Sequence, residues 1–286
     1  MDEKIFSGKG ANLNYAESLL NGSPLLLLHG LTFRWQSFSS LIPELSKRCH
    51  VYAVDLRGHG KSSHDFAQYR YEDLVNDTVE FITECVGQPT AIFGHSLGAA
   101  VGFAAAARLG GLAQALIIAD NFLYHDSFME ITGQPFLRSM FRGVQRIAAL
   151  GQTSDEVLRL LVKTRLPLGD GEITVGELFA GKSRFLAAWA ESIAQLDPKS
   201  VEIFFTPLLP EEFNGDLRLN EITCPILFLQ ASPALGGILP DRDLERVLSI
   251  RPEAAVHRFE EMGHMMHMED PEPIAPVVQA FLDSLT

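Results

Sequence analysis

The segment Gly-His-Ser-Leu-Gly at positions 94–98 contains the residues of this sequence that are best suited to chemistry. It follows the apolar run 90–93 and precedes a stretch rich in Ala and Gly, which is typical of a closely packed helix. A Gly-x-Ser-x-Gly sequence between a strand and a helix favours a nucleophile elbow, a sharp turn that raises the serine hydroxyl to the start of the helix. An ordinary turn with Ser96 as a helix cap is the simpler alternative. Because strand, turn and helix agree, we predict that Ser96 is a nucleophile.

A serine nucleophile needs a base, and His264 is the histidine placed to supply it. It follows the last predicted strand, 255–259, and precedes the final helix. It can therefore approach Ser96 from a loop at the carboxyl ends of the strands. His264 and His267 could instead bind a metal, but no third cluster of ligands accompanies them. We predict His264 as the general base and no metal site.

The stretch 28–32 ends another buried strand, where main-chain N–H groups can point at a developing oxyanion. We predict that the amides of Leu31 and Leu97 are the donors, each contributing on the order of 3 kcal/mol. A plain turn between strand and loop is the alternative for 28–32 taken alone.

The elements around these residues alternate between short apolar strands and amphipathic helices, which predicts a parallel sheet covered by helices on both faces. The predicted strands are 12–16, 24–29, 50–55, 90–93, 115–120, 226–230 and 255–259. The alternation stops between 121 and 215, where helical patterns rich in large apolar residues take over. We predict an α/β core from residues 1–120 and 216–286 with an all-helical cap inserted at 121–215. The predicted substrate-binding residues are Phe33, Arg34, Trp35, His95, Phe122 and Trp189.

Arg34 follows the oxyanion turn and could bind a substrate carboxylate, although a solvated loop residue is the simpler interpretation.

Composition excludes several classes of function. The 286 residues carry 23 Lys and Arg against 36 Asp and Glu, a formal net charge of −13 without a basic cluster, which disfavours nucleic acid and anionic membrane surfaces as partners. The three cysteines form no CxxC pair, and the first residues lack the pattern of a signal peptide. We expect a cytoplasmic protein with reduced thiols, a monomer or a homodimer.

With the Asp-Leu-Arg-Gly-His-Gly-Lys-Ser sequence at 55–62, these motifs resemble those of the α/β-hydrolase fold with a helical cap. The resemblance covers essentially the whole chain, and the four motifs occur in the family's order. It implies a Ser-His-acid hydrolase that works without a metal or an organic cofactor. Serine at the elbow disfavours dehalogenases and epoxide hydrolases, which resemble this pattern but use Asp there.

One departure from the family concerns the acid. The family usually places it after the strand that corresponds to 226–230, but here the loop reads Ala-Ser-Pro-Ala-Leu-Gly-Gly, and the next carboxylates are Asp241 and Asp243. Some relatives carry the acid after the strand that follows the nucleophile helix, where this chain has Asp120. We predict Asp120 as the acid that orients His264. Asp241, Asp243 or no acid at all remain as alternatives.

These observations together predict a hydrolase of carboxylic esters or lactones that acts on a small hydrophobic substrate through an acyl-enzyme on Ser96. Two other functions use the same residues. One is hydrolysis of a C–C bond in a dienoic ketone, and the other is a receptor that binds a small hydrophobic ligand with little turnover.

Overall fold

The computed structural model describes residues 1–64, 66–206 and 214–285. Its centre is an eight-stranded sheet in the order β1-β2-β4-β3-β5-β6-β9-β10. Strand β2 is antiparallel to both of its neighbours, β1 and β4, and all other neighbouring strands are parallel. The strands are β1 (Asp2–Ser7), β2 (Asn12–Glu17), β3 (Ser23–Leu28), β4 (Cys49–Val54), β5 (Thr90–His95), β6 (Ala113–Ala119), β9 (Ile226–Ala231) and β10 (Ala255–Phe259). The predicted α/β class with a mostly parallel sheet is confirmed.

Helices cover both faces of the sheet, which explains why the central strands read as unbroken apolar runs. In β3, Leu26 and Leu28 face a cluster that includes α2 and α3, whereas Leu25 and Leu27 face a second cluster with α1 and α12. The helices of this core are α1 (Ile42–Leu45), α2 (Tyr71–Glu80), α3 (Leu97–Leu109), α9 (Gly215–Glu221), α10 (Asp241–Ile250), α11 (Met266–Glu269) and α12 (Ile274–Asp283). Short 3-10 helices are η1 (Trp35–Phe38), η3 (Gly110–Leu112) and η5 (Pro233–Leu235), and η2 (Phe81–Val86) is a π-helix that continues α2.

Strand β1 was not predicted, because its residues are almost all exposed and show no apolar alternation. It pairs with β2 at the edge of the sheet. In the described residues, no helix combines the length and the apolar character needed to cross a bilayer.

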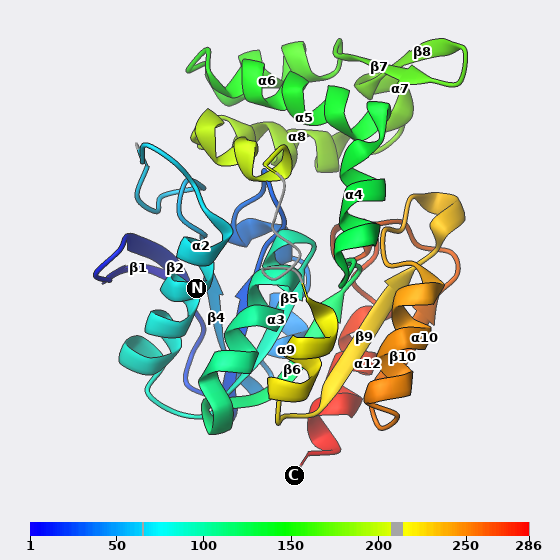
Figure 1. Cartoon of the computed structure of the whole chain (residues 1–286). Helices are drawn as coiled ribbons and strands as arrows, with labels where there is room; N and C mark the ends of the chain where they lie inside the picture. The colour runs from blue at the N-terminus through cyan, green and yellow to red at the C-terminus, as the bar shows by residue number, and fades with distance from the viewer. Residues whose placement is uncertain (65, 207–213, 286) are drawn as a thin grey trace.

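Residues 125–204 form a separate layer above the carboxyl ends of the parallel strands (Figure 1), here called the upper layer. It contains α4 (His125–Gly133), α5 (Pro135–Ala148), α6 (Ser154–Leu161), β7 (Arg165–Leu168), β8 (Gly171–Thr174), α7 (Val175–Leu178), α8 (Ser183–Ile193) and η4 (Pro198–Phe204). Its own apolar core is made chiefly by α5, α6 and α8. Residues 207–213, which belong to the predicted insertion, lie outside the described residues.

The expectation of an all-helical insertion is wrong in one place. Strands β7 and β8 pair antiparallel as a hairpin, with Leu166 opposite Ile173. A two-residue turn joins them, in which Gly169 has a φ of 56°. The Gly-Asp-Gly sequence at 169–171 is the local signal for such a turn.

Candidate active site

Ser96 lies in a sharp turn between β5 and α3, with φ 52° and ψ −121°. The two glycines of the motif make this turn possible. A Cβ on Gly94 would lie 2.3 Å from the carbonyl oxygen of Gly98, and a Cβ on Gly98 would lie 2.1 Å from that of Leu28. Both contacts are far too short for any side chain. The local sequence therefore specifies a strained elbow that presents Ser96 at the N-terminus of α3.

Asp120 and His264 meet directly. The Oδ2 atom of Asp120 lies 2.7 Å from Nδ1 of His264, and the Asp120 side chain is completely buried. The same carboxylate accepts the amides of Ala231 at 3.1 Å and Ile238 at 2.9 Å, so the loop after β9 holds it in place. Because the protonated Nδ1 donates to the carboxylate, Nε2 is the unprotonated ring nitrogen and can accept a proton.

The two alternative acids are engaged elsewhere. Asp241 is exposed and pairs with Arg258 at 2.7 Å. Asp243 is buried, accepts the hydroxyl of Ser127 at 2.6 Å, and has a pKa raised by burial. The structure therefore brings Asp120 to His264 and leaves both alternatives away from it.

The turn after β3 is held by two buried histidines. Nε2 of His29 accepts the amide of Leu56 at 3.0 Å, and Nε2 of His59 accepts that of Thr32 at 3.3 Å. Burial lowers the pKa of His29 to about 4 and that of His59 to about 3, so both rings stay neutral and able to accept. Leu31, within this turn, and Leu97, at the start of α3, both line the cavity that contains Ser96.

Backbone strain gathers at the same place. In the described part of the chain, the non-glycine residues with positive φ are Thr32, Ser96 and Asp120, at 71°, 52° and 44°. Each follows the carboxyl end of a parallel strand: β3, β5 or β6. Such conformations cost about 1–3 kcal/mol each and cluster where a fold holds functional groups in fixed positions.

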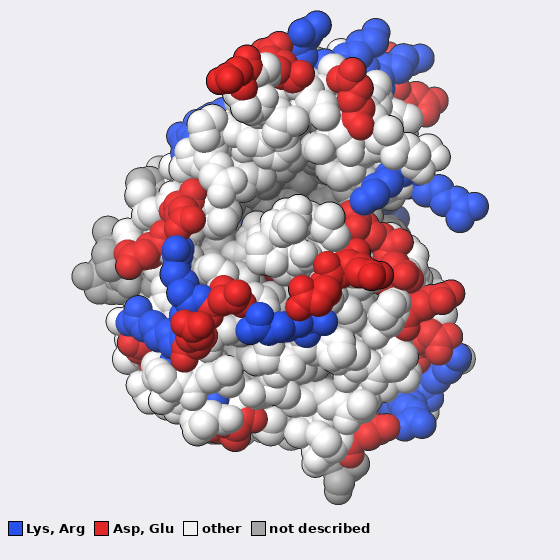
Figure 2. All heavy atoms as spheres, turned by 90° about the vertical axis from the view of Figure 1, so that its right-hand side faces the viewer, with Lys and Arg blue, Asp and Glu red and all other residues white. Residues whose placement is uncertain are grey.

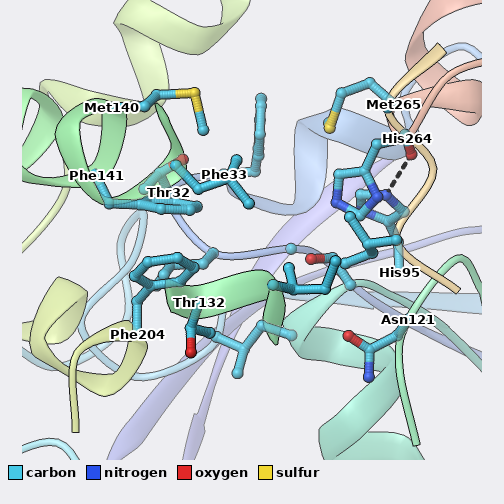
Figure 3. Close-up of a pocket in the computed structure, with 18 of the residues that line it drawn as sticks. Thr32, Phe33, His95, Asn121, Thr132, Met140, Phe141, Phe204, His264 and Met265 are labelled. Atoms are coloured by element: carbon cyan, nitrogen blue, oxygen red, sulfur yellow. Dashed lines mark hydrogen bonds between the residues drawn. The ribbon is translucent and has the colours of Figure 1, made fainter. Parts of the chain in front are cut away.

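A cavity of about 750 Å³ lies between the sheet and the upper layer. Of the predicted substrate-binding residues, Phe33, His95, Phe122 and Trp189 line it, together with Ser96 and His264. Sequence reasoning missed several other lining residues that Figure 3 shows: Thr32, Asn121, Thr132, Met140, Phe141, Phe204 and Met265. The apolar spacing in α5 marked a buried face, but it could not tell cavity wall from packed core.

Arg34 and Trp35 are not among the residues that line the cavity, so their prediction as substrate-binding residues is wrong. Arg34 forms an ion pair with Glu191 of α8 at 2.5 Å. Trp35 begins η1, and its indole N–H donates to Glu3 at 2.8 Å. The turn at η1 directs both side chains to partners away from the cavity.

The mouth of the cavity opens on the face shown in Figure 2, where the surface is hollowed between the upper layer and the core. Exposed leucines line this opening: Leu168 and Leu178 from the upper layer and Leu235 from the loop after β9. Lys182 and Glu269, at the same opening, form an ion pair at 2.7 Å between the upper layer and α11. The opening is therefore mostly apolar, with one ion pair at its rim.

Two further histidines, His95 and His267, lie near His264: the His95 ring contacts both of the others. Nε2 of His95 donates to the carbonyl oxygen of His264 at 2.8 Å (Figure 3). His267 is completely buried, with its ring stacked on Phe38 at 4.7 Å between centroids. Neither ring nitrogen of His267 has a hydrogen-bond partner among the described residues, and burial lowers its pKa to about 3. His267 therefore serves as a packed neutral ring.

We expect the substitution His267→Phe to make the protein more tolerant of acid. The pKa of His267 falls from 6.5 in the unfolded chain to about 3 when folded, so only the unfolded state gains this proton as the pH drops below about 6.5. Stability is thus lost toward low pH, by about 2 kcal/mol per such site at pH 5. Urea unfolding at pH 8 and pH 5 should show that the variant loses about 2 kcal/mol less than the parent. Equal losses of stability in the variant and the parent would contradict the low pKa of His267 in the folded protein.

Among the residues described, no group of three or more His, Cys, Asp or Glu side chains is arranged to hold a metal ion.

Comparison with known proteins agrees with this architecture. The model of the alpha/beta hydrolase family matches residues 25–277. Ethanol acetyltransferase 1 of Cyberlindnera fabianii is 30% identical over 126 residues, but this match covers 43% of the chain and only 37% of that enzyme. The chain thus spans little more than a third of the length of this relative.

Other similarities extend over the whole chain. The (E)-2-((N-methylformamido)methylene)succinate hydrolase of Acinetobacter baylyi is 23% identical over 92% of this chain and 91% of its own. The structure of an N-formylmaleamic acid deformylase from Pseudomonas putida superposes with a TM-score of 0.74 at 21% identity, covering 97% of this chain and 100% of that one. At such identity the structural likeness shows the fold alone. The family model, by contrast, matches the sequence over residues 25–277, which is most of the chain. The chain therefore belongs to the alpha/beta hydrolase family.

Proposed function

We propose that this protein is a serine hydrolase that cleaves a carboxylic ester or a lactone of a small hydrophobic substrate through an acyl-enzyme on Ser96. The observation that carries the proposal is the 2.7 Å contact between Asp120 and His264 at the edge of an apolar cavity that also contains Ser96. In this proposal Ser96, His264 and Asp120 form a catalytic triad, and the upper layer acts as a cap over it.

The reaction begins when Nε2 of His264 takes the proton of the Ser96 hydroxyl as its oxygen attacks the ester carbonyl carbon. The amides of Leu31 and Leu97 stabilise the negative oxygen of the tetrahedral intermediate. His264 then protonates the leaving alcohol as the C–O bond breaks. Water, activated by the same histidine, attacks the acyl-enzyme and releases the acid and Ser96. Throughout, Asp120 holds the ring and stabilises its protonated form.

The charge of the cavity wall favours uncharged esters over succinate derivatives such as the one in the name of the Acinetobacter baylyi hydrolase. Lys182 is the one Lys or Arg among the described residues that line the cavity, and it is already paired with Glu269. A dicarboxylate substrate would enter a largely apolar space without a free cation to compensate its charge, which is costly.

Stopped-flow hydrolysis of a 4-nitrophenyl ester tests the proposal. We expect many turnovers per active site, and a fluorophosphonate probe should label the wild-type protein and spare Ser96→Ala. A receptor would release at most one equivalent of 4-nitrophenol. Labelling that persists in Ser96→Ala would place the nucleophile elsewhere, and a carbon–carbon hydrolase would act on a dienoic ketone far better than on any ester.

A further inference from the structure

The cavity has two ends with different chemistry. Figure 3 shows Phe141, Phe204 and Thr132 on one side of the cavity and His264 with Met265 on the other. The rings of Phe141, from α5, and Phe204, from η4, lie 4.2 Å apart between centroids. Phe122 and Phe128 form a second, edge-to-face pair at 5.6 Å, and both also line the cavity. We call the end of the cavity formed by Phe141, Phe204 and Thr132 the aromatic chamber.

The hydroxyl of Thr132, the one polar side chain of the chamber, already donates a hydrogen bond to the main chain. The Thr132 hydroxyl donates to the carbonyl oxygen of Phe128 at 2.8 Å. The hydroxyl of Tyr71, elsewhere in the cavity wall, donates to the carbonyl oxygen of Ala100 at 2.5 Å. The chamber therefore presents apolar surface to a ligand, and burying a charged or strongly polar group there would be unfavourable.

The proposed reaction decides which part of the substrate enters this chamber. In the tetrahedral intermediate the central carbon bears the Ser96 oxygen, the oxyanion, the leaving oxygen and the acyl carbon in four different directions. His264 must reach the leaving oxygen to protonate it, so the alcohol lies on the side of His264 and Met265. The acyl carbon is bonded in a different direction from the leaving oxygen, so the acyl group can extend across the cavity to the chamber, which lies opposite His264 (Figure 3).

We propose, on the basis of the function above, that the aromatic chamber binds the acyl group and that Phe141 and Phe204 set its maximum length. The substrate class is an ester or lactone of an uncharged alkyl or arylalkyl carboxylic acid. The alcohol part lies beneath Met265 toward the mouth, where exposed Leu235 leaves room for varied groups. Until the chamber is filled, each added acyl methylene should raise kcat/KM by about fourfold, as burial of apolar groups predicts.

Two ester series test this assignment. In the first, 4-nitrophenyl esters extend from acetate to dodecanoate; in the second, the acyl group is butyrate and the alcohol is methanol, butanol, 4-nitrophenol or 2-naphthol. Phe204→Ala, or Phe204→Leu if alanine impairs folding, should move the best acyl length upward by two or more carbons, and Phe204→Trp should move it downward. Met265→Ala should change the ranking of the alcohols and leave that of the acyl groups as it was.

Phe205→Ala is the matched control. Phe205 adjoins Phe204 but stacks under Arg142 at 3.6 Å and is not among the cavity-lining residues, so the acyl ranking should stay unchanged. The proposal is overturned if Phe204→Ala alters only the alcohol ranking, or if no chamber variant alters the acyl ranking. In either case Ser96-dependent ester hydrolysis in all variants would leave the proposed function standing. If no ester of either series is cleaved, both proposals fail.

Discussion

Replacing Ser96 by alanine is expected to lower kcat for aryl ester hydrolysis by about 10⁶-fold, and His264→Ala should cost about as much. The two residues act as one unit, because the hydroxyl is a poor nucleophile without the base and the base has no target without the hydroxyl. The double variant should therefore be hardly slower than either single one. Steady-state kinetics with an active-site titration of the parent protein provides the measurement.

His267→Phe is the control for this prediction, because His267 lies three residues from His264 and is buried without a hydrogen-bond partner among the described residues. It should keep most of the activity of the parent. Equal losses from the His264 and His267 variants would contradict the assignment of the base. Loss of activity on addition of a chelator would instead revive the alternative of a metal site.

Asp120→Asn is expected to lower kcat by about 10⁴-fold, the size of loss known when a triad aspartate becomes an amide. The substitution removes the charge that stabilises protonated His264. It also places an amide donor or a neutral oxygen where Oδ2 accepts from His264 and Ile238. We therefore expect a loss of stability of about 1–3 kcal/mol as well, since one buried donor loses its acceptor.

Asp243→Asn is the matched control, because it too removes a buried carboxylate that accepts a main-chain amide, from Leu123 at 2.9 Å. It should lower stability but leave kcat of the folded protein within a small factor. Measuring kcat and the denaturation midpoint of both variants separates the two effects. If Asp243→Asn or Asp241→Asn were crippled while Asp120→Asn stayed active, the acid would be in the first turn of α10 and our assignment wrong.

The sequence alone determined the parts of this protein that depend on local structure. The elbow around Ser96 was predictable because Gly94 and Gly98 are required by contacts within the turn and with the adjacent strand. The position of His264 after the last strand was predictable from the order of strands and helices, since the carboxyl ends of parallel strands share one edge of the sheet. The same reasoning placed Asp120 at that edge.

Tertiary structure decided everything that depends on how distant segments meet. Sequence left three carboxylates that could contact His264, and the fold brings Asp120 to it, with the amides of Ala231 and Ile238 holding its carboxylate in place. Arg34 follows the turn after β3 in sequence, yet its partner is Glu191 in the upper layer.

The aromatic chamber is the clearest case. Phe141 and Phe204 belong to different elements, and each alone reads as an apolar residue of a helical stretch. Only the packing of α5 against η4 brings their rings to 4.2 Å. Periodicity tells which side chains leave solvent, but a cavity wall and a packed core bury the same residue types, so the difference between them exists only in three dimensions.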